Sequence, residues 1–198
     1  IVYGEENILV CFEPAGLATQ TATVGHQDIV SELKHYLAKQ YRNMEVNKKA
    51  GIKGGQPYLG IIHRLDQPVE GLLVFAKDNR SAAKLTASLA QGILNKRYYA
   101  VVCGQPERTS AELVDYLAKE EVSGSAKVVQ EGAKGKKAVL QYQVVGQLSA
   151  PAPLSMLDIH IDTGRFHQIR VQMAHAGLPL IGDGRYGSEQ SKQLSRQL

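Results

Sequence analysis

The strands and helices that the sequence predicts permit an α+β fold. Two segments, 97–103 and 137–145, alternate apolar and polar residues as strands with one buried face do. A third segment, 27–41, instead repeats its apolar residues with the period of an amphipathic helix. Apolar residues make up 43% of the chain and charged residues 21%, which indicates a folded globule rather than a disordered chain.

The N-terminal half is predicted to contain two short strands around a helix. The first strand, 8–12, ends at a turn that includes Pro14 and Gly16. The helix, 27–41, carries Lys34 and Lys39 on its outward side. A second strand is predicted at 58–62. Residues 43–56, between the helix and this strand, are polar, basic and rich in Gly, and we hypothesise a loop that closes over nucleic acid.

The rest of the chain is predicted to contain two helices with three strands between them. Asp78 or Asn79 caps a helix over 80–91, which Gly92 ends. Strands are predicted at 97–103, 137–145 and 154–161, and residues 107–135 are expected to be irregular with short strands. A last helix covers 166–175, before Gly177. Its expected buried stripe consists of Phe166, Ile169, Met173 and Ala174.

Length and charge set broad limits on the protein. A chain of 198 residues fits one domain, and its net charge of +4 is compatible with a polyanionic partner. No apolar run approaches the ~18–20 residues that span a membrane, and the first residues lack a signal-like pattern, so we expect a cytoplasmic protein. Cys11 and Cys103 are expected to be buried apolar residues. His167 and His175 lie two helical turns apart, so no metal site is expected.

Basic residues gather in two segments, each of which is either a contact for nucleic acid or a solvated surface. They are Lys34, Lys39, Arg42, Lys48, Lys49 and Lys53 in the first, and Lys127, Lys134, Lys136 and Lys137 in the second.

The stretch 61–77 holds the residues best suited to chemistry. The strand at 58–62 runs into His63-Arg64-Leu65-Asp66, turns at Pro68 and Gly71, and returns as a second apolar strand. Loops held by rigid strands commonly present reactive groups. The alternative is an Arg64–Asp66 ion pair on the surface, which is common and contributes little to stability.

Four motifs follow one another along the chain. They are His63-Arg64-Leu65-Asp66 with Gly71-Leu72-Leu73-Val74-Phe75-Ala76-Lys77; Lys96-Arg97-Tyr98-Tyr99-Ala100-Val101-Val102; Gly135-Lys136-Lys137-Ala138 leading into Tyr142; and Thr163-Gly164-Arg165-Phe166-His167-Gln168-Ile169-Arg170-Val171 with Gly177-Leu178-Pro179-Leu180-Ile181-Gly182-Asp183 and Tyr186-Gly187. In this order they resemble the signatures of the RluA family of RNA pseudouridine synthases, over nearly the whole chain.

The resemblance implies a catalytic domain over 1–198 with the pseudouridine synthase fold, a mixed and mostly antiparallel sheet flanked by helices with a central active-site cleft. It implies that uridines in rRNA or tRNA are isomerised with Asp66 as the catalytic carboxylate. Strand alternation puts only one of Tyr98 and Tyr99 on the inward face, and the family register selects Tyr98 as catalytic. Arg170 lies beside the inward stripe, and a buried arginine needs an anion. The resemblance implies that this anion is Asp66; the alternative is an ion pair with any other internal carboxylate.

The resemblance also suggests which residues contact RNA. His63 and Arg64 flank the catalytic carboxylate, and Arg165, His167 and Gln168 belong to the fourth motif. Substrate and product of the isomerisation have the same composition, so no cofactor is expected, and we expect a monomer whose partner is RNA. The chain is expected to lack the RNA-binding S4 domain of many relatives, and its end at Leu198 is expected to omit a C-terminal strand.

Two departures from the family pattern leave rival functions open. Before Pro14 the family has Lys or Asn followed by Lys, and here Phe12-Glu13 puts an anion in place of a cation, so we expect no RNA contact there. Val69-Glu70 replaces Thr-Ser, which puts a second carboxylate four residues from Asp66 and allows a glycoside or nucleoside hydrolase with a carboxylate pair. We expect Glu70 to point to solvent. The other rival is an inactive RNA-binding paralogue that keeps the fold.

Overall fold

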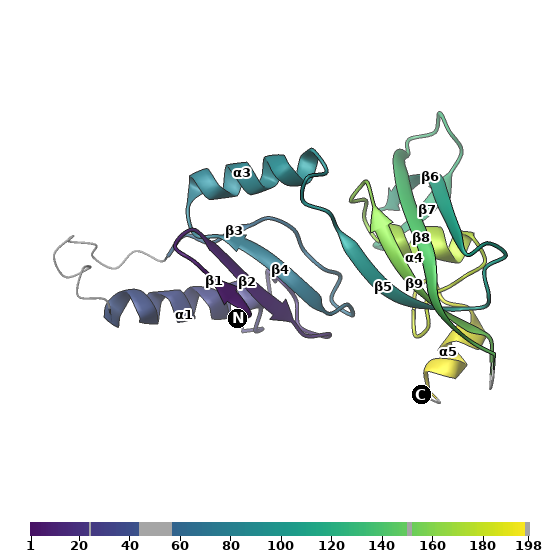
Figure 1. Cartoon of the computed structure of the whole chain (residues 1–198), viewed down its shortest axis with the longest axis horizontal. Helices are drawn as coiled ribbons and strands as arrows, with labels where there is room; N and C mark the ends of the chain where they lie inside the picture. The colour runs from purple at the N-terminus through teal and green to yellow at the C-terminus, as the bar shows by residue number, and fades with distance from the viewer. Residues whose placement is uncertain (24, 44–56, 150–151, 197–198) are drawn as a thin grey trace. The chain divides into compact units, whose positions relative to one another are not determined.

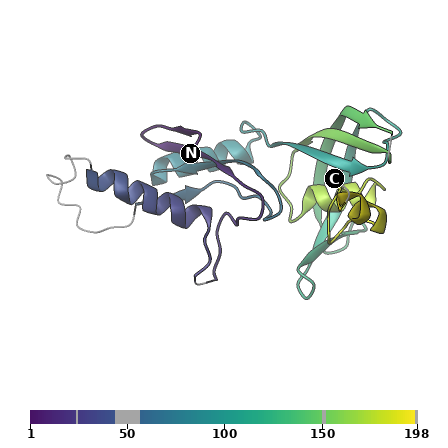
Figure 2. The ribbon, with the colours of Figure 1, turned by 90° about the horizontal axis from the view of Figure 1, so that it is seen from below.

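The computed structural model describes residues 1–23, 25–43, 57–149 and 152–196, and Figures 1 and 2 show it from two sides. Contacts divide the chain into two compact units, Ile1–Leu94 and Asn95–Leu198, and each is described by itself. The single catalytic domain over 1–198 therefore stays a prediction. Most of the expected loop at 43–56 lies outside the described residues.

The first unit is a four-stranded antiparallel sheet with helices on both sides (Figure 1). Its strands run in the order β1-β2-β4-β3, and its elements are β1 (Tyr3–Gly4), β2 (Ile8–Glu13), α1 (Ile29–Asn43), β3 (Gly60–Ile61), β4 (Gly71–Ala76) and α3 (Asn79–Ala90). Helix α1 packs the apolar stripe that the sequence predicted, from Ile29 to Leu37, against Leu73 and Phe75 of β4. This burial of one helix stripe on one sheet face forms the core of the unit.

The second unit is a five-stranded antiparallel sheet with α4 packed against it. The strand order is β5-β9-β8-β6-β7, and the elements are β5 (Arg97–Cys103), β6 (Ser110–Glu120), β7 (Ser125–Val129), β8 (Lys136–Leu148), β9 (Leu154–Ile161), α4 (Gln168–His175) and α5 (Glu189–Ser195). Leu140, Leu157, Ile159 and Met173 are fully buried between the sheet and α4. No helix in the described ranges is long and apolar enough to cross a membrane.

Most predicted elements are confirmed. The α+β class is confirmed, with two sheets in place of the single sheet expected. The strands at 8–12, 97–103 and 154–161 are present, and Asp78 caps α3 by accepting a hydrogen bond from Ser81 N. Gly92 and Gly177 follow their helices with φ of +71° and +76°, as glycines that end helices do. Cys11 and Cys103 are both buried.

Two predictions of local structure are wrong, and a third is confirmed only in part. Residues 110–120, expected to be irregular with short strands, form the long strand β6. This strand was not predicted because charged side chains interrupt its apolar alternation. The strand predicted at 58–62 pairs over only two residues at the edge of its sheet. The buried face of α4 includes Gln168 and Gln172 instead of Phe166, which lies before the helix and is 43% exposed. Apolar periodicity cannot find buried glutamines, whose amides bind the backbone.

Candidate active site

The loop that carries Asp66 is fixed at both ends of its turn. Val69 N donates to the Asp66 carbonyl at 2.8 Å, which closes the turn before β4. Gln67 is tied to Gly16 by two hydrogen bonds: its carbonyl accepts from Gly16 N at 2.7 Å, and its Nε2 donates to the Gly16 carbonyl at 2.9 Å. The loop at 63–70 is thus held to the turn after β2, as the placement of reactive groups on a braced loop requires.

The side chains of this loop differ in exposure. Asp66 is partly buried, whereas Arg64 is exposed and makes no ion pair among the described residues, so the surface pair between them is not what the structure contains. Glu70 is exposed, as expected. His63 is partly buried, and its Nε2 accepts a hydrogen bond from Val74 N at 3.3 Å. His63 therefore braces strand β4 from the loop.

A buried carboxyl, that of Glu13, is linked to the loop through Thr19, and no functional role was predicted for it from the sequence. Glu13 is fully buried, and its Oε1 accepts a hydrogen bond from Thr19 Oγ1 at 3.1 Å. Thr19 Oγ1 in turn accepts from Leu65 N at 3.4 Å. Burial raises the pKa of Glu13 above its ordinary value, and the hydrogen bond from Thr19 offsets only part of this effect. Burial of Glu13 agrees with the expectation that it makes no RNA contact.

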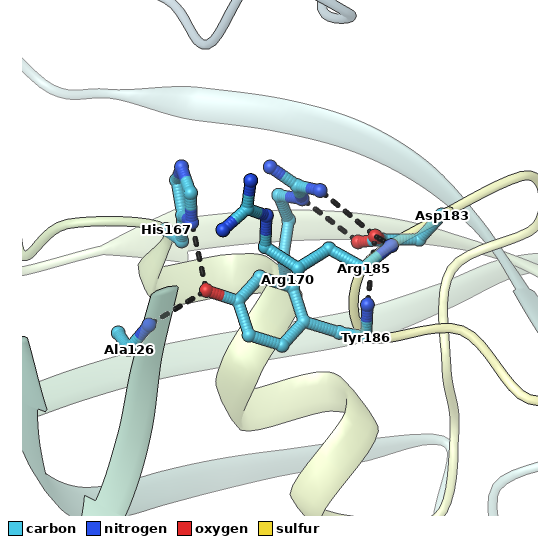
Figure 3. Close-up of polar contacts among 6 residues, drawn as sticks. All are labelled: Ala126, His167, Arg170, Asp183, Arg185 and Tyr186. Atoms are coloured by element: carbon cyan, nitrogen blue, oxygen red, sulfur yellow. Dashed lines mark hydrogen bonds and ion pairs between the residues drawn. The ribbon is translucent and has the colours of Figure 1, made fainter. Parts of the chain in front are cut away.

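Arg170 is held by Asp183 (Figure 3). Its Nε and Nη2 donate to the two carboxylate oxygens at 2.7 and 2.8 Å, and the two side chains are only 14% and 4% exposed. Asp183 also accepts from the backbone N–H of Arg185 and Tyr186. Burial alone would raise the pKa of Asp183, but these hydrogen bonds and the charge of Arg170 lower it below its ordinary value. The internal ion pair considered for Arg170 is therefore present, whereas its pairing with Asp66, in the other unit, stays a prediction.

The loop around Asp183 has a conformation that admits only glycine at 187. Gly187 N donates to the Asp183 carbonyl at 2.9 Å, and a Cβ on Gly187 would lie 2.2 Å from that same oxygen. The preceding segment is tied to β5, since Ile181 N donates to the Val101 carbonyl at 2.9 Å. The Gly-Asp and Tyr-Gly pairs of the fourth motif thus build the support of Arg170.

His167 is positioned by Tyr186 (Figure 3). The Tyr186 hydroxyl accepts from Ala126 N at 2.8 Å and lies 2.7 Å from His167 Nδ1. Burial raises the pKa of this phenol above its ordinary value. His167 has the left-handed backbone conformation, with φ of +54°, which is uncommon outside glycine.

Gln168 organises the turn before α4. Its Oε1 accepts from Thr163 Oγ1 at 2.7 Å and from Arg165 N at 3.0 Å, and its Nε2 donates to the Val139 carbonyl at 2.9 Å. Only 3% of Gln168 is exposed, so in this structure it positions the turn and does not offer an amide to a ligand. Arg165 itself is exposed, with Nε bound to the Lys137 carbonyl.

Of the paired tyrosines, Tyr98 faces inward. It is partly buried and packs against the core of the second unit, whereas Tyr99 is 63% exposed. Asp183 and Tyr186 stand in the motifs, but sequence reasoning gave them no role, because loop positions have no periodicity. Within the described ranges, no three His, Cys, Asp or Glu side chains gather as metal ligands.

Comparison with solved structures defines the fold class. The chain resembles the human RNA pseudouridylate synthase domain-containing proteins 4 and 1, with TM-scores of 0.73 and 0.69 at 21% and 22% identity. The two matches cover 96% and 97% of this chain and 69% and 71% of the solved chains. The chain therefore has the fold of the pseudouridylate synthase domains.

Sequence comparison shows the family. The model of the RNA pseudouridylate synthase family matches residues 7–175. Ribosomal large subunit pseudouridine synthases D of Zymomonas mobilis and Pseudomonas aeruginosa are 34% and 36% identical over 94% of this chain, and an uncharacterized RNA pseudouridine synthase of Bacillus subtilis is 30% identical over all of it. The chain belongs to this family, which confirms the resemblance to RluA-type enzymes. It spans 55%, 53% and 60% of these relatives' lengths.

Proposed function

We propose that the protein is an RNA pseudouridine synthase that isomerises specific uridines in structured rRNA or tRNA, with Asp66 as the catalytic carboxylate. The observation that carries this proposal is that the family match at 7–175 includes Asp66, on a loop fixed by Gly16 and Val69. Relatives named for the large ribosomal subunit favour rRNA. Action in the cytoplasm and as a monomer belongs to the same proposal.

The reaction breaks the N1–C1′ bond of uridine, turns the base, and rejoins it through C5. C1′ becomes electron-poor as the base leaves, so a carboxylate at Asp66 either attacks it or removes a sugar proton to give a glycal; both routes remain open. Tyr98 would stack on the uracil and assist removal of the C5 proton. Arg170 would pair with Asp66 and keep it ionised. No redox partner or ATP is required, because substrate and product are isomers.

The proposed RNA contacts differ in how they are supported. Arg64 and Arg165 are exposed cations that can bind backbone phosphates. His167, which is held by Tyr186, and His63, which stands next to Arg64, are the other proposed contacts. Gln168 contributes by positioning Arg165 and not through a contact of its own. A uridine within folded RNA must leave its stack to reach such residues.

The deciding experiment is tritium release from RNA labelled at uridine C5. We expect release by the wild type and its loss in Asp66→Asn, because the amide can neither attack C1′ nor accept a proton. Glu70→Gln is the matched control: it makes the same change on an exposed carboxylate four residues away, and it should retain activity.

Three outcomes would contradict the proposal. Equal activity of Asp66→Asn and wild type would remove Asp66 from the chemistry. Free uracil in place of pseudouridine, lost in Glu70→Gln, would establish the hydrolase. Salt-sensitive RNA binding without any release would establish an inactive RNA-binding paralogue.

A further inference from the structure

Two cationic side chains of the second unit, Lys96 and Arg165, lie against the same turn. Lys96 precedes β5, and Ile161 N, at the end of β9, donates to its carbonyl at 3.4 Å. Its Nζ lies so close to Gly164 that a Cβ on this glycine would be 2.9 Å from it. Arg165 follows directly. The lysine ammonium therefore rests on the backbone next to the arginine.

The turn under these cations is fixed. Val139 N donates to Thr163 Oγ1 at 3.1 Å, and the buried amide of Gln168 binds both Thr163 and Arg165 N. Arg165 Nε is bound to the Lys137 carbonyl at 2.9 Å, which fixes the direction of the guanidinium. The fold thus sets the position of the guanidinium and of the turn on which the lysine ammonium lies.

In the part of the chain that the structure describes, this pair of like charges has no counter-charge. Within the described ranges neither Lys96 nor Arg165 makes an ion pair with a carboxylate, and Asp162, the acidic residue next in sequence to the turn, is 3.0 Å from His160 instead. Burial lowers the pKa of the Lys96 ammonium below its ordinary value, and the charge of Arg165 lowers it further. Holding the partly buried Lys96 ammonium beside a second cation is unfavourable unless an anion binds there.

We propose that Lys96 and Arg165 together bind one phosphate group of the RNA backbone. A phosphate matches both donors, since a guanidinium can bind two oxygens through its fork and an ammonium acts as a point charge. The inference rests on the proposed function, because that function supplies RNA as the polyanion. It adds Lys96 to the RNA contacts, and it assigns Gly164 the role of letting the ammonium reach the turn.

The test is the salt dependence of binding to a short labelled oligouridylate, followed by fluorescence anisotropy. Log K falls as log salt rises, and for single strands the magnitude of this slope, called the slope below, decreases by about 0.7 for each phosphate that the protein no longer neutralises. We expect the double variant Lys96→Gln/Arg165→Gln to lower the slope by about 0.7, with smaller changes in the single variants, because both cations hold the same phosphate. Lys96→Arg keeps the charge and should keep the slope.

Two controls separate this effect from a change in overall charge or in structure. Lys127→Gln removes a cation that Glu120 already pairs at 2.7 Å, so its slope should stay at the wild-type value. Gly164→Ala keeps both charges but displaces the ammonium, and it should weaken binding as Lys96→Gln does. Circular dichroism on every variant verifies the fold.

Several results would overturn the proposal. A double variant with the wild-type slope would show that no phosphate is held, and a fall of about 1.4 would show two separate phosphates in place of a shared one. If inorganic phosphate protected Lys96 from amine-modifying reagents as well as the oligouridylate does, at the same phosphate concentration, the site would belong to the free ion. Tritium release is scored separately: its absence in the wild type, with the slope change intact, would reject the enzyme and leave the phosphate site standing.

Discussion

Asp183→Asn tests how strongly the fold depends on the carboxylate that holds Arg170. In the wild type, Oδ1 accepts from Arg170 Nη2, Arg185 N and Tyr186 N, and Oδ2 accepts from Arg170 Nε. Asparagine keeps an oxygen for the first three bonds. Its amide nitrogen then faces the Nε–H of Arg170 at a place where both groups are donors. The substitution therefore removes one hydrogen bond and the counter-charge of a buried guanidinium.

The expected loss of stability follows from the burial of the pair. Removing one partner of a buried ion pair costs about 3–5 kcal/mol, and a hydrogen bond to a charged group contributes about 1.5–3 kcal/mol. Because three of the four bonds have an acceptor in the variant, we expect a loss of about 3 kcal/mol, or roughly 6–12 °C in Tm.

Urea unfolding followed by far-UV circular dichroism measures this loss, since the chain contains no tryptophan. Glu189→Gln is the matched control, the same change in the same unit, because its side chain is 84% exposed and lies 3.3 Å from Lys192. It should change the unfolding free energy by less than about 0.5 kcal/mol. If Asp183→Asn were destabilised no more than this control, the reasoning about the buried pair would be refuted.

The difference in unfolding free energy between the wild type and Asp183→Asn should also depend on pH, which provides a second check. The folded-state pKa of Asp183 lies below the ordinary 3.8, so its contribution to stability is present above about pH 4 and is lost as pH falls through the folded pKa. Asparagine does not titrate. The advantage of the wild type over Asp183→Asn should therefore shrink as the pH is lowered below about 4.

Two further predictions concern the first unit, and both are measured by urea unfolding. Asp78→Ala removes the side chain that accepts from Ser81 N at 2.8 Å at the start of α3, and it should cost about 1 kcal/mol; Asp78→Asn, which retains an acceptor, should lose less. Glu13→Gln should stabilise the protein at neutral pH, because glutamine keeps an acceptor for Thr19 without a buried charge. The folded-state pKa of Glu13 is raised above 4.5, so this gain should disappear as the pH falls through the folded-state pKa toward 4.5. A gain independent of pH would contradict the reasoning.

Elements with a regular repeat could be predicted from the sequence. The strand at 97–103 follows from alternation, and the helix after Asp78 follows from a cap and a helix-ending glycine, signals that lie close together in sequence. Alternation put one of Tyr98 and Tyr99 inward, and the family register selected Tyr98. Prediction failed where the apolar repeat is weak. Charged residues interrupt the alternation of β6, and glutamines occupy part of the buried face of α4. Local patterns report burial only when the buried residues are apolar.

The sequence by itself determined the class of fold, the four motifs and their order, and hence the family; the catalytic role of Asp66 is a prediction from the same motifs. The tertiary structure decided which groups meet: Asp183 with Arg170, Glu13 with Thr19 and Leu65 N, and Lys96 with the turn at Gly164. These contacts join residues that are distant in sequence or lie on loops without periodicity. Hydrogen bonds and charges of this kind depend on distances that only the folded chain sets.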